Sequence, residues 1–154
     1  MRPLKWRSQA VTPSVRQVPA QDTGCIRTLV ADDSDIFRQM VCELMEMEPV
    51  IDIVGQASDG LEVIEAVAAL HPDLVIMEVH LPYLDGLKAS ALIARYYPDV
   101  LILLMSADDS PKTREQGRIQ GAHAFIPKDE LIAGMPQALG ELFSSLFQIT
   151  AKPA

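Results

Sequence analysis

The sequence has few cysteines and no long hydrophobic run, and these two shortages exclude several classes of protein. Two cysteines in 154 residues cannot build the disulfide framework of a small secreted protein. The longest uninterrupted apolar run, residues 100–105, is far shorter than the roughly 20 residues that a membrane-spanning helix needs. We therefore expect a protein of the reducing cytoplasm that has no membrane as its partner.

Basic residues are also scarce. The 13 lysines and arginines against 21 aspartates and glutamates give a net charge of −8, whereas binding to nucleic acid phosphates needs clustered positive charge. We therefore expect no direct nucleic-acid binding. Residues 1–21 nevertheless hold four basic residues, no acidic one and three of the 11 prolines. We expect residues 1–24 to be a disordered basic arm, which either has no task or serves an acidic partner.

The remaining composition is that of one globular domain, with 49% hydrophobic and 22% charged residues. From residue 25 onward, short apolar runs that predict strands alternate five times with segments that predict helices. The predicted strands are 26–31, 51–57, 73–79, 99–107 and 122–126. The last helix is expected near Pro136 after a turn at 129–134, with an apolar stripe of Leu139, Leu142, Phe143, Leu146 and Phe147. This alternation predicts an α/β fold, a doubly wound parallel sheet with helices on both faces.

Five chemically active residues follow the predicted strands. Asp32 and Asp33 follow the first, Glu78 ends the third, Ser106 ends the fourth, and Lys128 lies beside the end of the fifth. Parallel strands end at one edge of the sheet, so these residues are expected to converge there. Each alone also has a structural explanation, such as an acidic helix start or a solvated lysine. Together, the carboxylates suit Mg²⁺, and the hydroxyl and ammonium suit the oxygens of a phosphoryl group.

Four segments, LVADDSDIFRQM, DLVIMEVHLPYLDGL, LLMSA and GAHAFIPKDE, resemble in order and spacing the receiver domain of bacterial two-component response regulators. The resemblance covers residues 26–148 and implies a flavodoxin-like sheet of five parallel strands in the order 2-1-3-4-5. The site residues that it implies are Asp32, Asp33, Glu78 and the backbone carbonyl of His80 for Mg²⁺, Ser106 and Lys128 for the phosphoryl group, and Ser106 and Phe125 for the switch. The partners that it implies are a histidine kinase, a phosphotransfer protein or an output protein, and it is compatible with a homodimer.

Position 78 departs from the family, whose phosphoryl acceptor at this position is an aspartate. The additional methylene of Glu78 moves the carboxylate outward by roughly 1.5 Å of chain length. Phosphoryl transfer depends on in-line positioning, and a misplacement of about 1 Å can cost on the order of 10² in rate. We therefore expect Glu78 to be a poor acceptor that partly mimics the phosphorylated state. The leading hypothesis is a phosphorylation-independent receiver module that binds a partner protein.

Two alternatives stay open at this point. One is an ordinary phospho-accepting regulator of a phosphorelay, in which Glu78 accepts slowly or replaces an aspartate through engineering. The other is a small Mg²⁺-dependent α/β phosphatase with Asp32 as its nucleophile. Residues 25–148 are predicted to form the receiver domain and residues 149–154 a tail, which leaves no room for an output domain. The chain is therefore expected not to be an enzyme and to act through another protein, unless it is a fragment.

Overall fold

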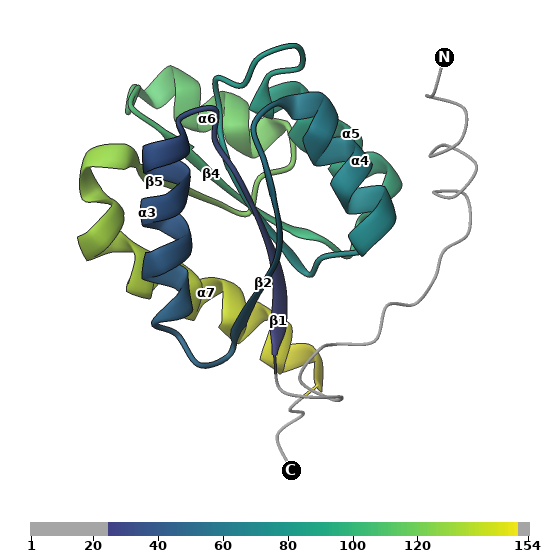
Figure 1. Ribbon diagram of the computed structural model, residues 1–154, viewed down its shortest axis with the longest axis vertical. Helices are drawn as coiled ribbons and strands as arrows, with labels where there is room; N and C mark the ends of the chain where they lie inside the picture. Colours follow the sequence, from purple (N-terminus) through teal and green to yellow (C-terminus); the bar gives the residue numbers. More distant parts are fainter. Residues whose placement is uncertain (1–24, 151–154) are drawn as a thin grey trace.

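The computed structural model describes residues 25–150, with side chains up to residue 144. Strands and helices alternate along this part of the chain, and their labels follow Figure 1. The elements are β1 (Ile26–Ala31), α3 (Asp35–Glu46), β2 (Ile51–Ala57), α4 (Gly60–Leu70), β3 (Leu74–Glu78), α5 (Gly86–Tyr96), β4 (Leu101–Ser106), α6 (Pro111–Ile119), β5 (Ala124–Pro127), the 3₁₀ turn η1 (Lys128–Glu130) and α7 (Leu131–Thr150).

The five strands form one parallel sheet in the order β2-β1-β3-β4-β5. The predicted doubly wound fold with strand order 2-1-3-4-5 is therefore confirmed. All residues of the central strand β3 are buried, and alternate residues face opposite sides of the sheet. Leu74 and Ile76 belong to one apolar core, and Val75 and Met77 to the other. A strand that is covered on both faces carries a continuous apolar run, which is why the sequence predicted it.

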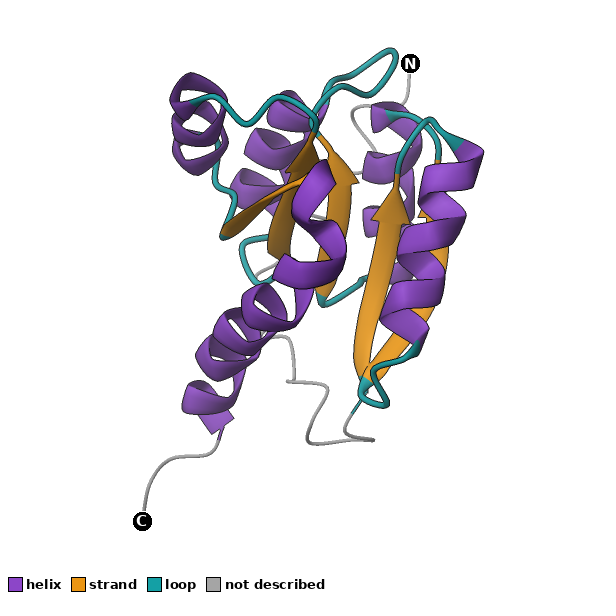
Figure 2. Cartoon of the chain, turned by 90° about the vertical axis from the view of Figure 1, so that its left-hand side faces the viewer, coloured by secondary structure: helices purple, strands orange, loops and turns teal. Residues whose placement is uncertain are grey.

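The helices divide between the two faces of the sheet, as Figure 2 shows. Helices α3 and α7 contribute to the first core through Val41, Cys42, Met45, Met135 and Leu139. Helices α4 and α5 contribute to the second core through Val63, Ile64, Val67, Ala89 and Ile93, and α6 packs beside α5 and β5. Burial of these side chains, worth about 1.5–3 kcal/mol for each large one, holds the strand ends in a fixed arrangement.

Four helices begin at a side-chain cap near the carboxyl edge of the sheet. Ser34, Asp59, Asp85 and Ser110 each accept a hydrogen bond from the backbone N–H three residues further on. Such caps contribute typically about 1 kcal/mol each. They fix the point at which each loop turns into a helix, and thereby fix the loops that surround the candidate site.

The expected turn at 129–134 and helix start near Pro136 are wrong. The chain forms the short turn η1 and then one helix, α7, with Pro136 inside it. An interior proline removes a backbone hydrogen bond at a cost of about 3 kcal/mol. A buried stripe offsets this cost, because Leu131, Met135, Leu139 and Leu142 recur at helical spacing and all pack into the first core. Four such side chains contribute roughly 6–12 kcal/mol, so packing outweighs the local preference of proline.

Several predictions for the chain ends lie outside the described residues. These are the basic arm at 1–24, residues 151–154 of the predicted tail, and the side chains of Leu146 and Phe147. Within residues 25–150, no helix combines the length and the apolar character that crossing a bilayer would require.

Candidate functional site

Three charged side chains from different strands meet at the carboxyl edge of the sheet. Asp32 directly follows β1, Glu78 ends β3, and Lys128 directly follows β5. The Nζ atom of Lys128 lies 2.8 Å from Oδ2 of Asp32 and 2.6 Å from Oε1 of Glu78. The structure therefore brings together three of the residues that the sequence singles out, and it joins them by a shared ammonium group.

This cluster is largely shielded from water. Asp32 is completely buried, Glu78 is 5% exposed, and the side chain of Lys128 is 18% exposed. The other carboxylate oxygens accept backbone hydrogen bonds, since Ser34 N–H donates to Oδ1 of Asp32 and His80 N–H to Oε2 of Glu78, both at 2.9 Å. The contact at Oδ2 of Asp32 is an ion pair without hydrogen-bond geometry. Buried carboxylates are tolerated because they are paired in this way.

The cluster carries two carboxylates and one ammonium. Burial lowers the pKa of Lys128, but the contacts with Glu78 and Asp32 outweigh burial and raise its pKa above the ordinary value. The ammonium therefore stays protonated at neutral pH. The ring centroid of Phe37 lies 4.1 Å from Nζ, so an aromatic face adds a favourable cation–π contact.

The two residues that the resemblance implies as a switch have contacts outside this cluster. Ser106 is completely buried at the end of β4, and its Oγ accepts the backbone N–H of Asp108 at 3.0 Å. Phe125 in β5 is partly buried, and its ring faces the guanidinium of Arg114 at 4.9 Å. Ser106 therefore orders the start of the loop between β4 and α6, and Phe125 has its partner on α6.

The carboxylates expected to bind Mg²⁺ do not all lie together in the described residues. Asp33 is exposed, whereas Asp32 and Glu78 are buried. Nowhere in residues 25–144 do three or more acidic, histidine or cysteine side chains gather as they would around a metal. The two carboxylates that are close together, Asp32 and Glu78, already share the ammonium of Lys128. Mg²⁺ requires oxygens at about 2.0–2.1 Å in near-octahedral geometry, so the present arrangement does not fit it.

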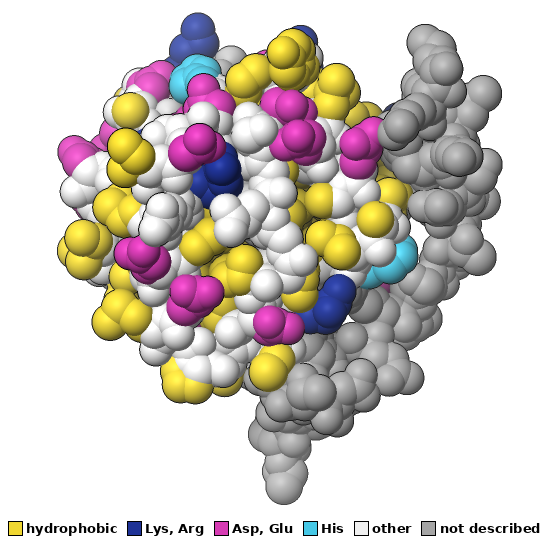
Figure 3. Space-filling model, viewed as in Figure 1, with side chains coloured by type: hydrophobic (Ala, Val, Ile, Leu, Met, Phe, Trp, Pro, Cys, Tyr) yellow, Lys and Arg dark blue, Asp and Glu magenta, His cyan; other side chains and the backbone are white. Residues whose placement is uncertain are grey.

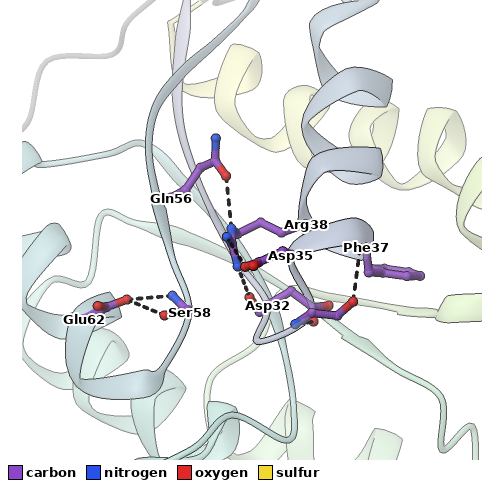
Figure 4. A network of polar contacts seen from close by, with 8 residues as sticks. Asp32, Asp35, Phe37, Arg38, Gln56, Ser58 and Glu62 are labelled. Carbon is purple, nitrogen blue, oxygen red and sulfur yellow. Dashed lines mark hydrogen bonds and ion pairs between the residues drawn. The ribbon is translucent and has the colours of Figure 1, made fainter.

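A second polar network fixes the turn that presents Asp32 (Figure 4). The guanidinium of Arg38 in α3 donates to the backbone carbonyl of Asp32 at 2.6 Å, to Oδ1 of Asp35 at 2.6 Å and to Oε1 of Gln56 at 3.0 Å. These bonds tie the start of α3 to strand β2. Figure 4 also shows Glu62 accepting from the backbone and hydroxyl of Ser58, which lowers the pKa of Glu62.

Sequence reasoning missed Phe37, Arg38 and Arg114 as residues of the site region. A signal for Phe37 exists in the sequence, because an aromatic in the first helical turn after Asp32 lies at the carboxyl edge of the sheet. A basic residue in that same turn, Arg38, is the corresponding signal for the loop network. Arg114 offers no comparable signal, because its contact with Phe125 depends on how α6 packs.

One face of the molecule carries acidic groups and exposed apolar side chains. Figure 3 shows acidic groups scattered over one face between apolar patches, with few basic groups. Ile36 at the start of α3 and Tyr83 in the loop after β3 are each 85% exposed. Tyr83 also has a φ of 68°, a left-handed conformation that is costly for a non-glycine residue. Two large apolar side chains are thus exposed on the segments that follow β1 and β3.

The comparisons with known proteins agree with this fold. A family model for the response regulator receiver domain matches residues 28–139. A protein-glutamate methylesterase/protein-glutamine glutaminase 2 of Photobacterium profundum is 31% identical over 127 residues, which cover 76% of this chain and 32% of that protein. A probable transcriptional regulatory protein NarL of Mycobacterium tuberculosis is 33% identical over 104 residues, which cover 68% of this chain and 48% of that protein. The chain thus spans about a third to about a half of the length of these curated relatives.

Solved structures of receiver domains superimpose on the chain. The signal receiver domain of NarL from Mycobacterium tuberculosis has a TM-score of 0.68 at 31% identity and covers 75% of this chain and 98% of its own. The response regulator domain of Thermotoga maritima CheB has a TM-score of 0.66 at 28% identity and covers 84% of this chain and 99% of its own. The chain belongs to the response regulator receiver domain family.

Proposed function

We propose that the chain is a phosphorylation-independent receiver module of two-component signalling that binds a partner protein. The observation that carries the proposal is the 2.6 Å ion pair between Oε1 of Glu78 and Nζ of Lys128. In the family, the corresponding lysine pairs with the phosphorylated acceptor. Here an unmodified side chain already makes that pairing.

Glu78 is poorly placed to accept a phosphoryl group. Its two oxygens contact Lys128 and the N–H of His80, and only 5% of the residue is exposed. An attacking oxygen would first have to leave one of these partners. The additional methylene also displaces the carboxylate by roughly 1.5 Å of chain length relative to an aspartate. Both effects oppose in-line transfer.

The imitation of the phosphorylated state is partial. A glutamate carries one negative charge, whereas a phosphoryl group carries about −1.5 to −2 and three acceptor oxygens. Ser106 uses its hydroxyl oxygen for the N–H of Asp108, so its hydroxyl hydrogen remains for a different acceptor. We assign Glu78 to the acceptor position, Lys128 to charge pairing, and Ser106 and Phe125 to a conformational response.

The partner follows from the family and from the surface. Receiver domains act with histidine kinases, phosphotransfer proteins or output domains. The exposed Ile36 and Tyr83 lie on the segments that follow β1 and β3, the strands whose ends carry Asp32 and Glu78. Residues 25–148 are proposed as the receiver domain. We propose no catalytic activity for it. The phosphatase hypothesis requires Asp32 as nucleophile, and Asp32 is completely buried and ion-paired.

The test is incubation of the full chain with Mg²⁺ and acetyl phosphate, followed by intact-mass measurement. We expect no phosphoryl adduct on the wild-type chain and a clear adduct on E78D. The variant E115D, with the same chemical change at an exposed ion pair on α6, is the matched control and should stay unlabelled. A stable adduct on Glu78 of the wild-type chain would overturn the proposal and favour the ordinary phospho-accepting regulator.

A further inference from the structure

Lys128 occupies the place between two carboxylates where a cation would be expected. Its Nζ atom is 2.8 Å from Asp32 and 2.6 Å from Glu78. The ring of Phe37 covers a further side at 4.1 Å. Two carboxylates and one aromatic face thus form a cage around the ammonium of Lys128.

The carboxylate oxygens of this cage are all in use. Oδ1 of Asp32 and Oε2 of Glu78 accept backbone hydrogen bonds, and the remaining two oxygens face the ammonium. A divalent ion would have to displace these contacts or lie beside a fixed like charge. Asp33, the third carboxylate of the region, is exposed. Every oxygen of the two buried carboxylates therefore already has a contact within the protein.

The ring of Phe37 faces the ammonium of Lys128 at 4.1 Å. The helix start that carries Phe37 is fixed by Ser34, whose Oγ accepts the N–H of Phe37 at 3.2 Å. An aromatic face attracts a cation most strongly where water is excluded, and Lys128 is largely buried. Phe37 is therefore a positioning residue for Lys128.

From these contacts we infer that the caged ammonium of Lys128 replaces the divalent cation, so that this receiver site is closed to Mg²⁺. The inference rests on the proposed function, since it explains how Glu78 pairs with Lys128 without a metal. The inference also goes beyond the proposed function, because a closed site would have a conformation that is independent of the concentration of divalent ions. It also predicts two ways to open the site. One is removal of the ammonium, and the other is shortening of Glu78 to aspartate, which draws the carboxylate away from Nζ of Lys128.

The experiment is titration of the full chain with Mn²⁺, followed by electron paramagnetic resonance of the free ion and by calorimetry, with Mg²⁺ as competitor. We expect no saturable binding to the wild-type chain at millimolar ion. K128Q removes the ammonium, whose positive charge repels the divalent ion, and keeps both carboxylates. Its dissociation constant should be at least about tenfold below the lower limit measured for the wild-type chain. K112Q, the same change at an exposed lysine on α6, should behave as wild type. Saturable wild-type binding that Mg²⁺ displaces, or a folded K128Q that binds no better, would overturn the inference.

Phe37 supplies a second variant that does not depend on K128Q folding. F37L keeps an apolar side chain and removes the aromatic face, and F37Y restores it. If the ring holds the ammonium between the carboxylates, Mn²⁺ binding measured as above should become detectable in F37L and should be lost again in F37Y. A folded F37L that excludes Mn²⁺ as the wild-type chain does would refute the positioning role.

The two proposals fail separately. A wild-type chain that binds Mn²⁺ but stays unlabelled by acetyl phosphate overturns only the closed site. A wild-type chain that binds no Mn²⁺ but becomes labelled on Glu78 overturns only phosphorylation independence.

Discussion

The substitution E78Q tests the ion pair at the centre of the site. It keeps the shape of the side chain and an acceptor for the N–H of His80, and it removes the negative charge 2.6 Å from Nζ of Lys128. Removing one partner of a buried ion pair lowers the free energy of unfolding by about 3–5 kcal/mol when the other charge is left unpaired. Lys128 keeps its second carboxylate, Asp32, and the ring of Phe37, so we expect the lower end of this range, about 3 kcal/mol.

The assay is urea unfolding followed by circular dichroism at pH 7 and low salt. A loss of about 3 kcal/mol leaves a domain of ordinary stability still folded, because such domains have about 5–15 kcal/mol. The matched control is E115Q, which breaks an exposed ion pair with Arg118 on α6. Exposed pairs contribute about 0–1 kcal/mol. If E78Q cost no more than E115Q, the buried pair would not hold the site, and the reasoning would be refuted.

Three further predictions concern other parts of the structure. The Nδ1 atom of His123 accepts the N–H of Ile102, and burial lowers the pKa of His123. As the pH falls, the unfolded chain therefore binds a proton at His123 before the folded chain does. The free energy of unfolding should fall as the pH drops below about 6.5. Urea midpoints at pH 7 and pH 5 should differ less in H123Q, and an equal difference would contradict this sign. R114M should lower the unfolding free energy by about 0.5–1 kcal/mol, because it removes the contact with Phe125 and the exposed ion pair with Asp109. An unchanged unfolding midpoint would contradict this prediction. S34A should cost about 1 kcal/mol through loss of the α3 cap, and a stability equal to wild type would speak against that cap.

Much of the fold could be predicted because burial leaves a pattern in the sequence. The buried strand β3 carries Leu74–Met77 as an unbroken apolar run, and Asp85 marks a helix start through its side-chain cap. Pro136 was misleading, since the local preference of proline is visible in sequence whereas the packing of α7 that overrides it is not.

The strand-end residues of the site were predictable from the sequence, and the contacts that helix packing creates were not. Asp32, Glu78 and Lys128 follow strands that are parallel, and parallel strands end at one edge. The ring of Phe37 over Lys128 and the guanidinium of Arg114 over Phe125 depend on how helices pack and on side-chain orientation. The spacing of residues in the sequence therefore does not predict these contacts.

The most direct test of phosphorylation independence is a set of ¹H–¹⁵N NMR spectra of the wild-type chain and E78D, each with Mg²⁺ and with or without acetyl phosphate. We predict that the wild-type spectrum does not change with acetyl phosphate. We also predict that its signals near Ser106, Phe125 and Lys128 lie closer to those of phosphorylated E78D than to those of unmodified E78D. A wild-type spectrum that matches unmodified E78D and shifts on addition of acetyl phosphate would contradict the account.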